Sequence, residues 1–500
     1  MKMATVLLDL IEPQTLLVTL VALAVAYYLF CSSSHELPPG PRAWPVIGNL
    51  LDLGKYGRTK VHLYYSELQK KYGNVYRIYF GSSMMTIVNG YGPVHEVLVK
   101  QGGVFSYRPT WLYSTREATK KARGIIWGDG EEWTQIRRMT LRALRDLGVG
   151  KSPLEERITE EIHYLKDVLT DLDEHPVQIR KLLTRSVANV IYSVVFGSRF
   201  EYDDLTFKSL LDVTDNLFRT QGAMGAINAI PSLRHLPYFK KLMRPYFEGI
   251  EKMTTYAEAR IEEHRRTYQD DVERDYVDVF IKYEAENPES TVYTTSNMTR
   301  CILDLIFAGT ETTSGTLDFG VLYMIKYPDV QHKCQKEIDR VVGCGRAVRV
   351  SDRPSLVYTE ATIMEIQRMS SVASAAVLRT SPWDAWVGGY RIPRNTLVYT
   401  NICSVLHDPD QWGDPHIFKP ERFITPERNI LYPDPWIPFG GGPRMCAGEI
   451  LARMELFLFF SNLLQSFHFS KVGNAEPDID PEFGMTMTPK SYEVTVQSRL

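Results

Sequence analysis

The most informative stretch of the sequence is PFGGGPRMCAG at residues 438–448, which stands directly before an apolar helical run from Ile450 to Phe467. Its three consecutive glycines allow unusual backbone dihedrals and a close approach to a flat ligand. Cys446 precedes the helix, where backbone amides and the positive end of the helix dipole favour a thiolate. A thiolate placed in this way is a good axial metal ligand, whereas an isolated cysteine is more often a small buried apolar residue. The rest of the sequence has to decide between these interpretations.

The composition predicts a folded protein with a large core. Hydrophobic residues make up 44% and charged residues 23% of the 500 residues, and no low-complexity tract is present. A net charge of -3 without long runs of Lys or Arg gives no reason to expect a nucleic acid as a partner. The cysteines at positions 31, 301, 334, 344, 403 and 446 form no CxxC pair. Neither a disulfide framework nor a structural zinc site is therefore predicted, and a reducing compartment fits best.

The N-terminus predicts a membrane anchor. Thr15 to Phe30 is uncharged, and with its flanking leucines it approaches the roughly 17–25 apolar residues that span a bilayer. A cleaved signal peptide is the main alternative, but Asp9 and Glu12 carry the wrong charge for the region before its apolar core. The acidic start also argues against a mitochondrial transit peptide. We expect a transmembrane helix within residues 1–31.

Prolines at positions 38, 39, 41 and 45 prevent this helix from continuing. Residues 32–45 are therefore interpreted as a stiff hinge between the anchor and a folded body, or as a plain domain-boundary linker. No internal repeat and no second linker follow, so residues 46–500 are predicted to form one domain.

Helical periodicity dominates this domain. Tyr76 to Val88, which ends in Asn89-Gly90, predicts a strand pair, and Tyr492 to Val496 predicts a further strand. The longest predicted helix runs from Ser296 to Lys326, before Pro328, and would cross the whole domain. Other helices are predicted at 155–172, 177–195, 246–268, 327–342 and 361–370. The predicted fold class is mainly α with small β-sheets.

Five further motifs give the cysteine segment a context. The segment matches the pattern F-x-x-G-x-R-x-C-x-G, and the chain also contains, in order, Pro38-Pro39-Gly40-Pro41, Trp133-Thr134-Gln135-Ile136-Arg137, Ala308-Gly309-Thr310-Glu311-Thr312-Thr313, Glu365-Ile366-Gln367-Arg368 and Pro420-Glu421-Arg422-Phe423. Together they resemble the proline hinge, the WxxxR helix, the oxygen-activation motif, the ExxR pair, the PERF motif and the haem-binding loop of the cytochrome P-450 superfamily. Their style is most similar to the animal microsomal group, which contains steroid hydroxylases and oxidisers of foreign compounds.

The resemblance implies a single-domain cytochrome P-450 fold whose cofactor is haem, with Cys446 as the axial ligand of the iron. Arginines pair well with the two haem propionates, because their donors match carboxylate geometry. The cofactor-binding residues implied are Trp133, Arg137, Arg379, Phe439, Arg444 and Gly448.

The same resemblance assigns roles on the oxygen side and in the support of the cysteine loop. Thr312 and Glu311 would be catalytic, through proton delivery during O–O cleavage. Ala308 and Gly309 would border the substrate pocket. Glu365 and Arg368, three residues apart on a helix, would form a buried ionic network with Arg422; an exposed i,i+3 pair is the plainer alternative.

One segment departs from the family pattern. Ser374 and Leu378 stand where prolines are expected between Arg368 and Arg379. Without proline the backbone is less constrained, so the path of this segment over the haem, and with it the role of Arg379, is less well defined by sequence.

The function that the resemblance implies is a monooxygenase. It would insert one oxygen atom from O2 into a lipophilic small molecule by hydroxylation or epoxidation, and would take electrons from NADPH through a reductase. The alternatives are a reductase-independent haem-thiolate isomerase or dehydratase acting on lipid peroxides, and a non-catalytic haem-binding membrane protein.

The expected partners follow from this function. They are an NADPH-dependent cytochrome reductase, with cytochrome b5 as a further candidate, and membrane lipid. Arg138, Arg142 and Arg145 share a helix face suited to an acidic electron donor, although such a face is as often merely solvated. The expected location is the endoplasmic reticulum membrane, with a single span and a cytosolic catalytic domain.

Overall fold

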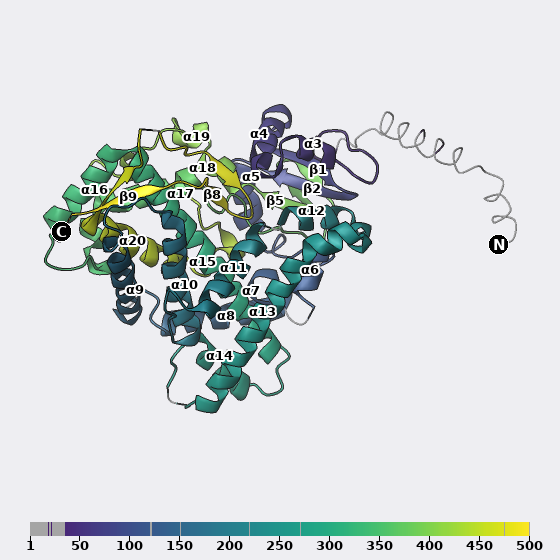
Figure 1. Cartoon of the computed structure of the whole chain (residues 1–500). Coiled ribbons are helices and arrows are strands. Elements are labelled where there is room, and N and C mark those ends of the chain that lie inside the picture. Colours follow the sequence, from purple (N-terminus) through teal and green to yellow (C-terminus); the bar gives the residue numbers. More distant parts are fainter. Residues whose placement is uncertain are drawn as a thin grey trace.

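The computed structural model describes residues 19, 22, 36–120, 123–150, 152–219, 221–270, 272–474 and 476–499. Its α-helices are α3 (Leu50–Lys55), α4 (Val61–Tyr72), α5 (Tyr91–His95), α6 (Tyr113–Ala118), α7 (Gly124–Trp127), α8 (Gly130–Asp146), α9 (Ser152–Thr170), α10 (Ile179–Phe196), α11 (Leu205–Arg219), α12 (Gln221–Ala229), α13 (Pro237–Thr267), α14 (Tyr276–Glu286), α15 (Thr295–Lys326), α16 (Pro328–Val341), α17 (Val357–Ser370), α18 (Ile402–Leu406), α19 (Pro409–Trp412) and α20 (Glu449–Ser466). Short 3-10 or π turns are η1 (Arg58–Lys60), η2 (Glu96–Lys100), η3 (Pro231–His235), η4 (Val350–Ser355), η5 (Pro420–Phe423) and η6 (Gly442–Arg444). The strands are β1 (Val75–Phe80), β2 (Ser83–Val88), β3 (Ala385–Val387), β4 (Tyr390–Ile392), β5 (Leu397–Thr400), β6 (Phe467–Lys471), β7 (Pro481–Phe483), β8 (Met487–Pro489) and β9 (Val494–Ser498). Figure 1 confirms a mainly helical fold with small sheets.

Helix α15 is the central element of this fold. Its N-cap is Thr294, whose hydroxyl accepts the amide of Asn297, and it ends before Pro328. From residue 310 to residue 325 every side chain is buried except Thr312, which is only partly covered. A helix that is buried nearly all round lies in a core, and α10, α17 and α20 surround this one (Figure 1).

Most predicted helix positions are confirmed to within a few residues; the clearest difference is α13. The sequence predicts a helix from Tyr246 to Tyr268, whereas α13 begins at Pro237 and continues through Pro245. Proline fits the first turn of a helix, and an interior proline is tolerated where packing compensates for the lost hydrogen bond. Here Met243 and Gly249 are buried on either side of Pro245. Tertiary packing therefore overrides the local signal.

The sheets are small and lie at the edge of the helical body. β1 and β2 pair antiparallel from Val75↔Val88 to Phe80↔Ser83, which confirms the predicted strand pair, and β5 adds in parallel to β2. β9, which pairs with β6, begins at Val494, two residues later than predicted. The segment without prolines runs beside β5, where Arg379 bridges Val398 through two backbone hydrogen bonds. Pairing with β5 therefore determines the path of this segment, which lacks the prolines that would restrict its backbone.

The predicted anchor from Thr15 to Phe30 lies outside the described residues. Within the part of the chain that the structure describes, no helix is both long and apolar enough to cross a bilayer. The described end of the hinge contacts the folded body. Arg77 on β1 donates its amide to Pro39 and a guanidinium N–H to Pro38, and a Cβ on Gly40 would lie 2.0 Å from the carbonyl oxygen of Arg77.

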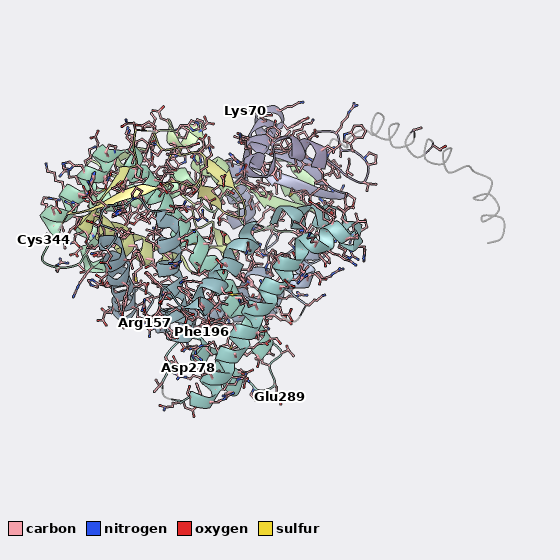
Figure 2. The ribbon with its side chains drawn as sticks, in the orientation of Figure 1. Lys70, Arg157, Phe196, Asp278, Glu289 and Cys344 are labelled. Atoms are coloured by element: carbon pink, nitrogen blue, oxygen red, sulfur yellow. The ribbon has the colours of Figure 1, made fainter. Side chains whose placement is uncertain are left out.

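A buried histidine ties α13 to α14 at the end of the molecule where Phe196 and Asp278 lie (Figure 2). The two ring nitrogens of His264 face acceptors, the carbonyl of Arg260 at 2.7 Å and a carboxylate oxygen of Asp275 at 2.8 Å. Both nitrogens can donate only in the imidazolium form. Burial lowers the pKa of His264, but the hydrogen bond and charge of Asp275 outweigh this effect, so the pKa is raised.

We expect His264→Gln to lower stability more at acidic than at alkaline pH. Because the folded-state pKa is raised, the stabilisation is fully present below the unfolded value of about 6.5 and is lost as the pH rises through the folded-state pKa. The midpoint of thermal unfolding, measured from about pH 6 to pH 9 beside the exposed control His163→Gln, checks this. A deficit that does not depend on pH would contradict it.

Candidate active site

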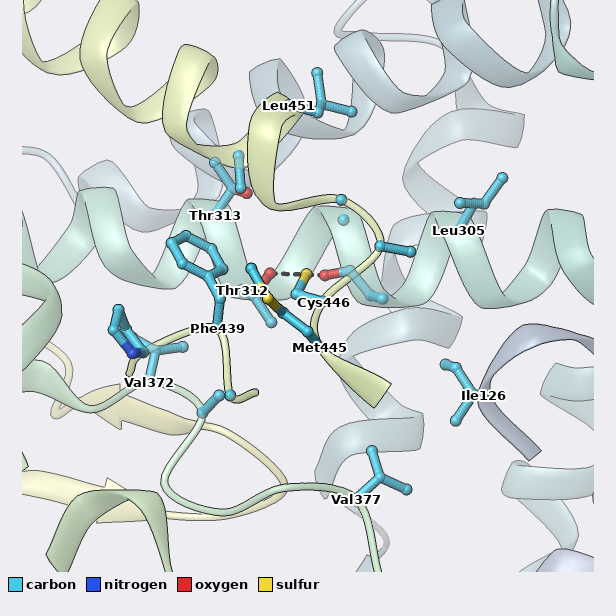
Figure 3. Close-up of a pocket in the computed structure, with 18 of the residues that line it drawn as sticks. Ile126, Leu305, Thr312, Thr313, Val372, Val377, Phe439, Met445, Cys446 and Leu451 are labelled. Atoms are coloured by element: carbon cyan, nitrogen blue, oxygen red, sulfur yellow. Dashed lines mark hydrogen bonds between the residues drawn. The ribbon is translucent and has the colours of Figure 1, made fainter. Parts of the chain in front are cut away.

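A cavity of about 330 Å³ lies beside α15, and Cys446 opens onto it. Figure 3 shows Cys446 across from Thr312, with Val372 and Val377 on one wall and Leu305 and Ile126 on another. The walls come from α15, from α7, from the segment before β5 and from the start of α20. Most of the lining is apolar, so the cavity suits a greasy, flat or compact molecule.

The cysteine loop owes its shape to close contact with η2. Gly440 and Gly442 have φ values of 74° and 68°, a region that glycine adopts without strain. A Cβ on Gly442 would lie 1.8 Å from the carbonyl oxygen of Leu98, so a side chain cannot fit there. The amide of Cys446 donates to the carbonyl of Phe439 at 3.0 Å. These contacts fix the sulfur at the edge of the cavity.

The pKa of Cys446 is raised in the protein without a bound metal. Burial raises the pKa of this thiol, while the hydrogen bond from the Gly448 backbone acts in the opposite direction. A bound metal cation deprotonates a coordinating thiol outright, so the thiolate at this position depends on ligation.

Four arginines from distant parts of the chain line the same cavity: Arg108, Arg137, Arg379 and Arg444. Burial lowers the pKa of Arg379 to about 10 and that of Arg444 to about 9, and in Arg444 the neighbouring charge of Arg379 adds to the effect. Arg379 is 2% exposed, and its Nε has no hydrogen-bond partner among the described residues. Clustered buried cations call for an anionic group. A macrocycle with two carboxylates beside a sulfur ligand satisfies this demand, so the residues fit haem.

Trp133 and Arg137, both on α8, also border this region. The Trp133 indole N–H donates to the carbonyl of Ile125 at 3.1 Å, and the guanidinium of Arg444 stacks 3.5 Å from the Trp133 ring centre. Arg137 donates to the carbonyl of Met445. The structure thus brings both residues to the cysteine loop, although the Trp133 donor is directed at the backbone.

Arg108 was not among the cofactor-binding residues predicted from the sequence. It is 6% exposed and donates to the carbonyls of Ile126, Val377 and Leu378. Burial and the charges of Arg444 and Arg379 lower the pKa of Arg108 well below its usual value. No local motif marks an isolated arginine in a loop, so only the fold reveals this position.

Glu455 on α20 is a second unpredicted residue. Its side chain is fully buried at the cavity wall, and neither carboxylate oxygen has a hydrogen-bond partner among the described residues. Burial raises its pKa well above the usual value, which favours the neutral acid.

The oxygen-side motif divides between two faces of α15. Ala308, Gly309 and Thr312 line the cavity, and the Thr312 hydroxyl donates to the carbonyl of Ala308 at 2.7 Å. Gly309 also permits α10 to approach, because a Cβ there would lie 2.5 Å from Ile191. Glu311 faces away, and its carboxylate pairs with Arg180 on α10 at 2.6 Å. The two residues predicted to act together are therefore held in different surroundings.

Glu365 and Arg368 form a fully buried ion pair on α17, with an Nε to Oε2 distance of 2.7 Å. Arg422 joins it at 3.1 Å from Oε1 of Glu365, and the remaining donors of Arg368 reach the carbonyls of Leu406 and Pro415. The network connects α17 with η5 and the preceding loops. Because both side chains are fully buried, the plainer interpretation of Glu365 and Arg368 as an exposed pair is wrong.

Comparison with known proteins agrees with this geometry. The sequence profile of the cytochrome P450 family matches residues 38–496. The chain is 34% identical to cytochrome P450 2J5 of Mus musculus over 487 residues, 96% of each protein. It is 35% identical to cytochrome P450 2B2 of Rattus norvegicus over 497 residues, covering 98% of this chain and all of the relative. The structure therefore defines a haem-thiolate monooxygenase, an oxidoreductase. The chain belongs to the cytochrome P450 family.

We expect Glu365→Gln to lower stability strongly, because it leaves buried Arg368 without a full counter-charge. Breaking a buried pair from one side costs about 3–5 kcal/mol. The matched control is Glu421→Gln, since Glu421 pairs with Lys333 at 3.0 Å while both are about half exposed. Such pairs contribute at most about 1 kcal/mol. Midpoints of thermal unfolding and haem content compare the two variants, and equal losses would contradict a structural network.

Arg379→Leu is expected to weaken haem retention. Loss of one charged hydrogen bond of about 1.5–3 kcal/mol predicts haem transfer to apomyoglobin that is faster by about tenfold or more. The control is the exposed Arg340→Leu on α16. If both variants release haem at the wild-type rate, Arg379 does not hold a propionate.

Proposed function

We propose that this chain inserts one oxygen atom from O2 into a neutral or weakly polar lipophilic small molecule, using electrons from NADPH that arrive through a reductase. The observation that carries the proposal is the single cavity onto which Cys446, the arginine cluster and Thr312 all open. A sulfur ligand, cations for two carboxylates and a hydroxyl beside an apolar space are the groups that this chemistry needs.

The cofactor residues divide into three tasks. Cys446 would ligate the iron, and Arg137, Arg379 and Arg444 would hold the propionates. Arg108 would add positive charge beside them, and Trp133 would support them through its stacking on Arg444. Phe439 and Gly448 shape the loop around the sulfur, and both line the cavity. When bound, the haem supplies one-electron and dioxygen chemistry. Glu365, Arg368 and Arg422 act only through the loops that they support.

Thr312 and Glu311 move protons in this proposal. The Thr312 hydroxyl is placed on the cavity side and donates to the Ala308 carbonyl; on turning from that carbonyl it would direct its proton into the cavity. Glu311 is paired with Arg180, whose side chain is 30% exposed, so the pair forms a link between solvent and the helix that carries Thr312. Ala308 and Gly309 leave room for substrate beside the hydroxyl.

The membrane arrangement is part of the same proposal. Residues 1–31 anchor the protein in the endoplasmic reticulum membrane, 32–45 form the hinge, and 46–500 form a cytosolic catalytic domain. Arg138, Arg142 and Arg145 are exposed on α8, behind the cysteine loop that Arg137 contacts, and offer a positive surface to an acidic reductase or to cytochrome b5.

The test is purification with haem, followed by spectroscopy and turnover. The reduced carbon monoxide complex of the wild type is expected to absorb near the wavelength after which the family is named, and Cys446→Ala is expected to lose this band. With a reductase, NADPH and a panel of steroids, fatty acids and drugs, a hydroxylated or epoxidised product should form. Haem-free protein, or an unchanged band in Cys446→Ala, would refute the proposal.

Thr312→Ala separates the alternatives. In a monooxygenase this variant should consume NADPH while releasing more hydrogen peroxide and less product, because protons no longer reach the right atom. Turnover of a lipid hydroperoxide without NADPH, unaffected by Thr312→Ala, would instead indicate an isomerase. Biological activity that needs Cys446 but no turnover would indicate a haem-binding protein without catalysis.

A further inference from the structure

A buried ion pair lies at the substrate side of the cavity. Asp304 stands one turn before Ala308 on α15 and is among the residues that line the cavity. One of its carboxylate oxygens lies 2.8 Å from a terminal nitrogen of Arg300, and the two side chains are 1% and 10% exposed. No feature of the proposed reaction uses either residue.

The second carboxylate oxygen of Asp304 holds α7 against α15. It accepts the amides of Ile125 and Ile126 at 2.9 and 3.0 Å. Gly124 makes this contact possible: its φ is 61°, and a Cβ there would lie 2.5 Å from that oxygen and 2.6 Å from Cγ of Arg300. The ion pair is therefore packed directly beneath the start of α7.

Through α7, the pair is also connected to the cofactor end of the cavity. The carbonyl of Ile125 accepts the Trp133 indole N–H at 3.1 Å, and the carbonyl of Ile126 accepts Nε of Arg108 at 2.8 Å. Asp304 thus sits at the junction between the substrate-facing wall and the arginine cluster.

The carboxylates of the cavity wall are few. Among the described residues that line it, only Asp304 and Glu455 carry one. Glu455 is fully buried without a hydrogen-bond partner for either oxygen among the described residues, and this burial favours its neutral form by raising the pKa. Asp304 is matched by one guanidinium and two amides. The apolar wall of Ile126, Leu305 and Val377 (Figure 3) therefore offers no unmatched negative charge to a ligand.

An organic cation entering such a cavity loses its hydration and gains no counter-charge. The free-energy cost of burying an unpaired ammonium is large, whereas a neutral molecule of the same shape avoids it. Burial raises the pKa of Asp304 even with Arg300 beside it. Removal of the positive charge at position 300 would therefore favour the neutral acid, whereas a cationic ligand in the place of the guanidinium would favour the carboxylate and gain its counter-charge.

We infer that Arg300 is a specificity-determining residue, which by pairing with Asp304 makes the cavity accept neutral lipophilic substrates and reject organic cations. This inference rests on the proposed function and names the substrate class of the same site. It concerns ligand binding to the haem-loaded protein, so it is tested without turnover.

The test uses two ligands of the same shape. Benzyltrimethylammonium carries a quaternary nitrogen that cannot coordinate iron, and neopentylbenzene has carbon in its place. Dissociation constants are measured from the change in haem absorbance on ligand binding. If one ligand causes no such change, its dissociation constant is measured by competition with the other ligand. The wild type should bind neopentylbenzene at least about 100-fold more tightly than benzyltrimethylammonium, equivalent to about 2.8 kcal/mol of binding free energy. Arg300→Met should lower the ratio of the two dissociation constants at least tenfold, and Arg300→Lys should leave it unchanged.

A double variant assigns the effect to Asp304. Arg300→Met should bind benzyltrimethylammonium more tightly than the wild type does, and this gain in affinity should vanish when Asp304→Asn is added. Should Arg300→Met not retain haem, Arg300→Gln removes the charge and keeps a hydrogen-bond donor in the same place. Equal binding of both ligands to wild type, or an unchanged ratio in the neutral variants, overturns the inference. A failed monooxygenase assay with the expected binding ratios would refute the proposed function alone.

Discussion

The rest of this structure depends on the requirement that charge buried around an apolar cavity be matched. Isolated ions inside a protein are unstable unless a partner or a set of hydrogen bonds compensates them. Glu365 meets two arginines, Glu311 meets Arg180 and Asp304 meets Arg300. Arg180 and Arg422 pair with glutamates on other helices, whereas Arg300 and Arg368 pair with residues one turn away on their own helix. The arginine cluster stands apart, and in the proposed function the two carboxylates of the cofactor would complete it.

This requirement divides the cavity into two ends with different chemistry. At one end, Cys446 is suited to bind the iron of a macrocycle, and Arg379 and Arg444 are suited to pair with its two carboxylates. Elsewhere the wall is apolar, and Asp304, where this wall meets the arginine cluster, is already paired with Arg300. Thr312 lines the same cavity as the partly covered residue on an otherwise buried stretch of α15. A polar hydroxyl at the boundary allows proton movement without placing a charge in the substrate space.

The sequence predicted the motifs well because each has a local physical basis. The glycines beside Cys446, the i,i+3 spacing of Glu365 and Arg368, and the length of the helix that carries Thr312 are visible in one dimension. The start of α13 was misplaced, because burial on both sides of Pro245 overrides what proline does in an isolated helix. The path through Ser374 and Leu378 was undefined by sequence, since pairing with β5 fixes it.

By itself, the sequence determined the family and the helical character of the chain and predicted Cys446 as the sulfur ligand, because these depend on residue type and spacing. Only the tertiary structure decided which charges meet. Arg108 and Glu455 carry no motif, and Glu311 turned out to face Arg180 rather than the cavity. The reason is physical: a buried charge is defined by partners far away in the chain, and sequence spacing does not encode those distances.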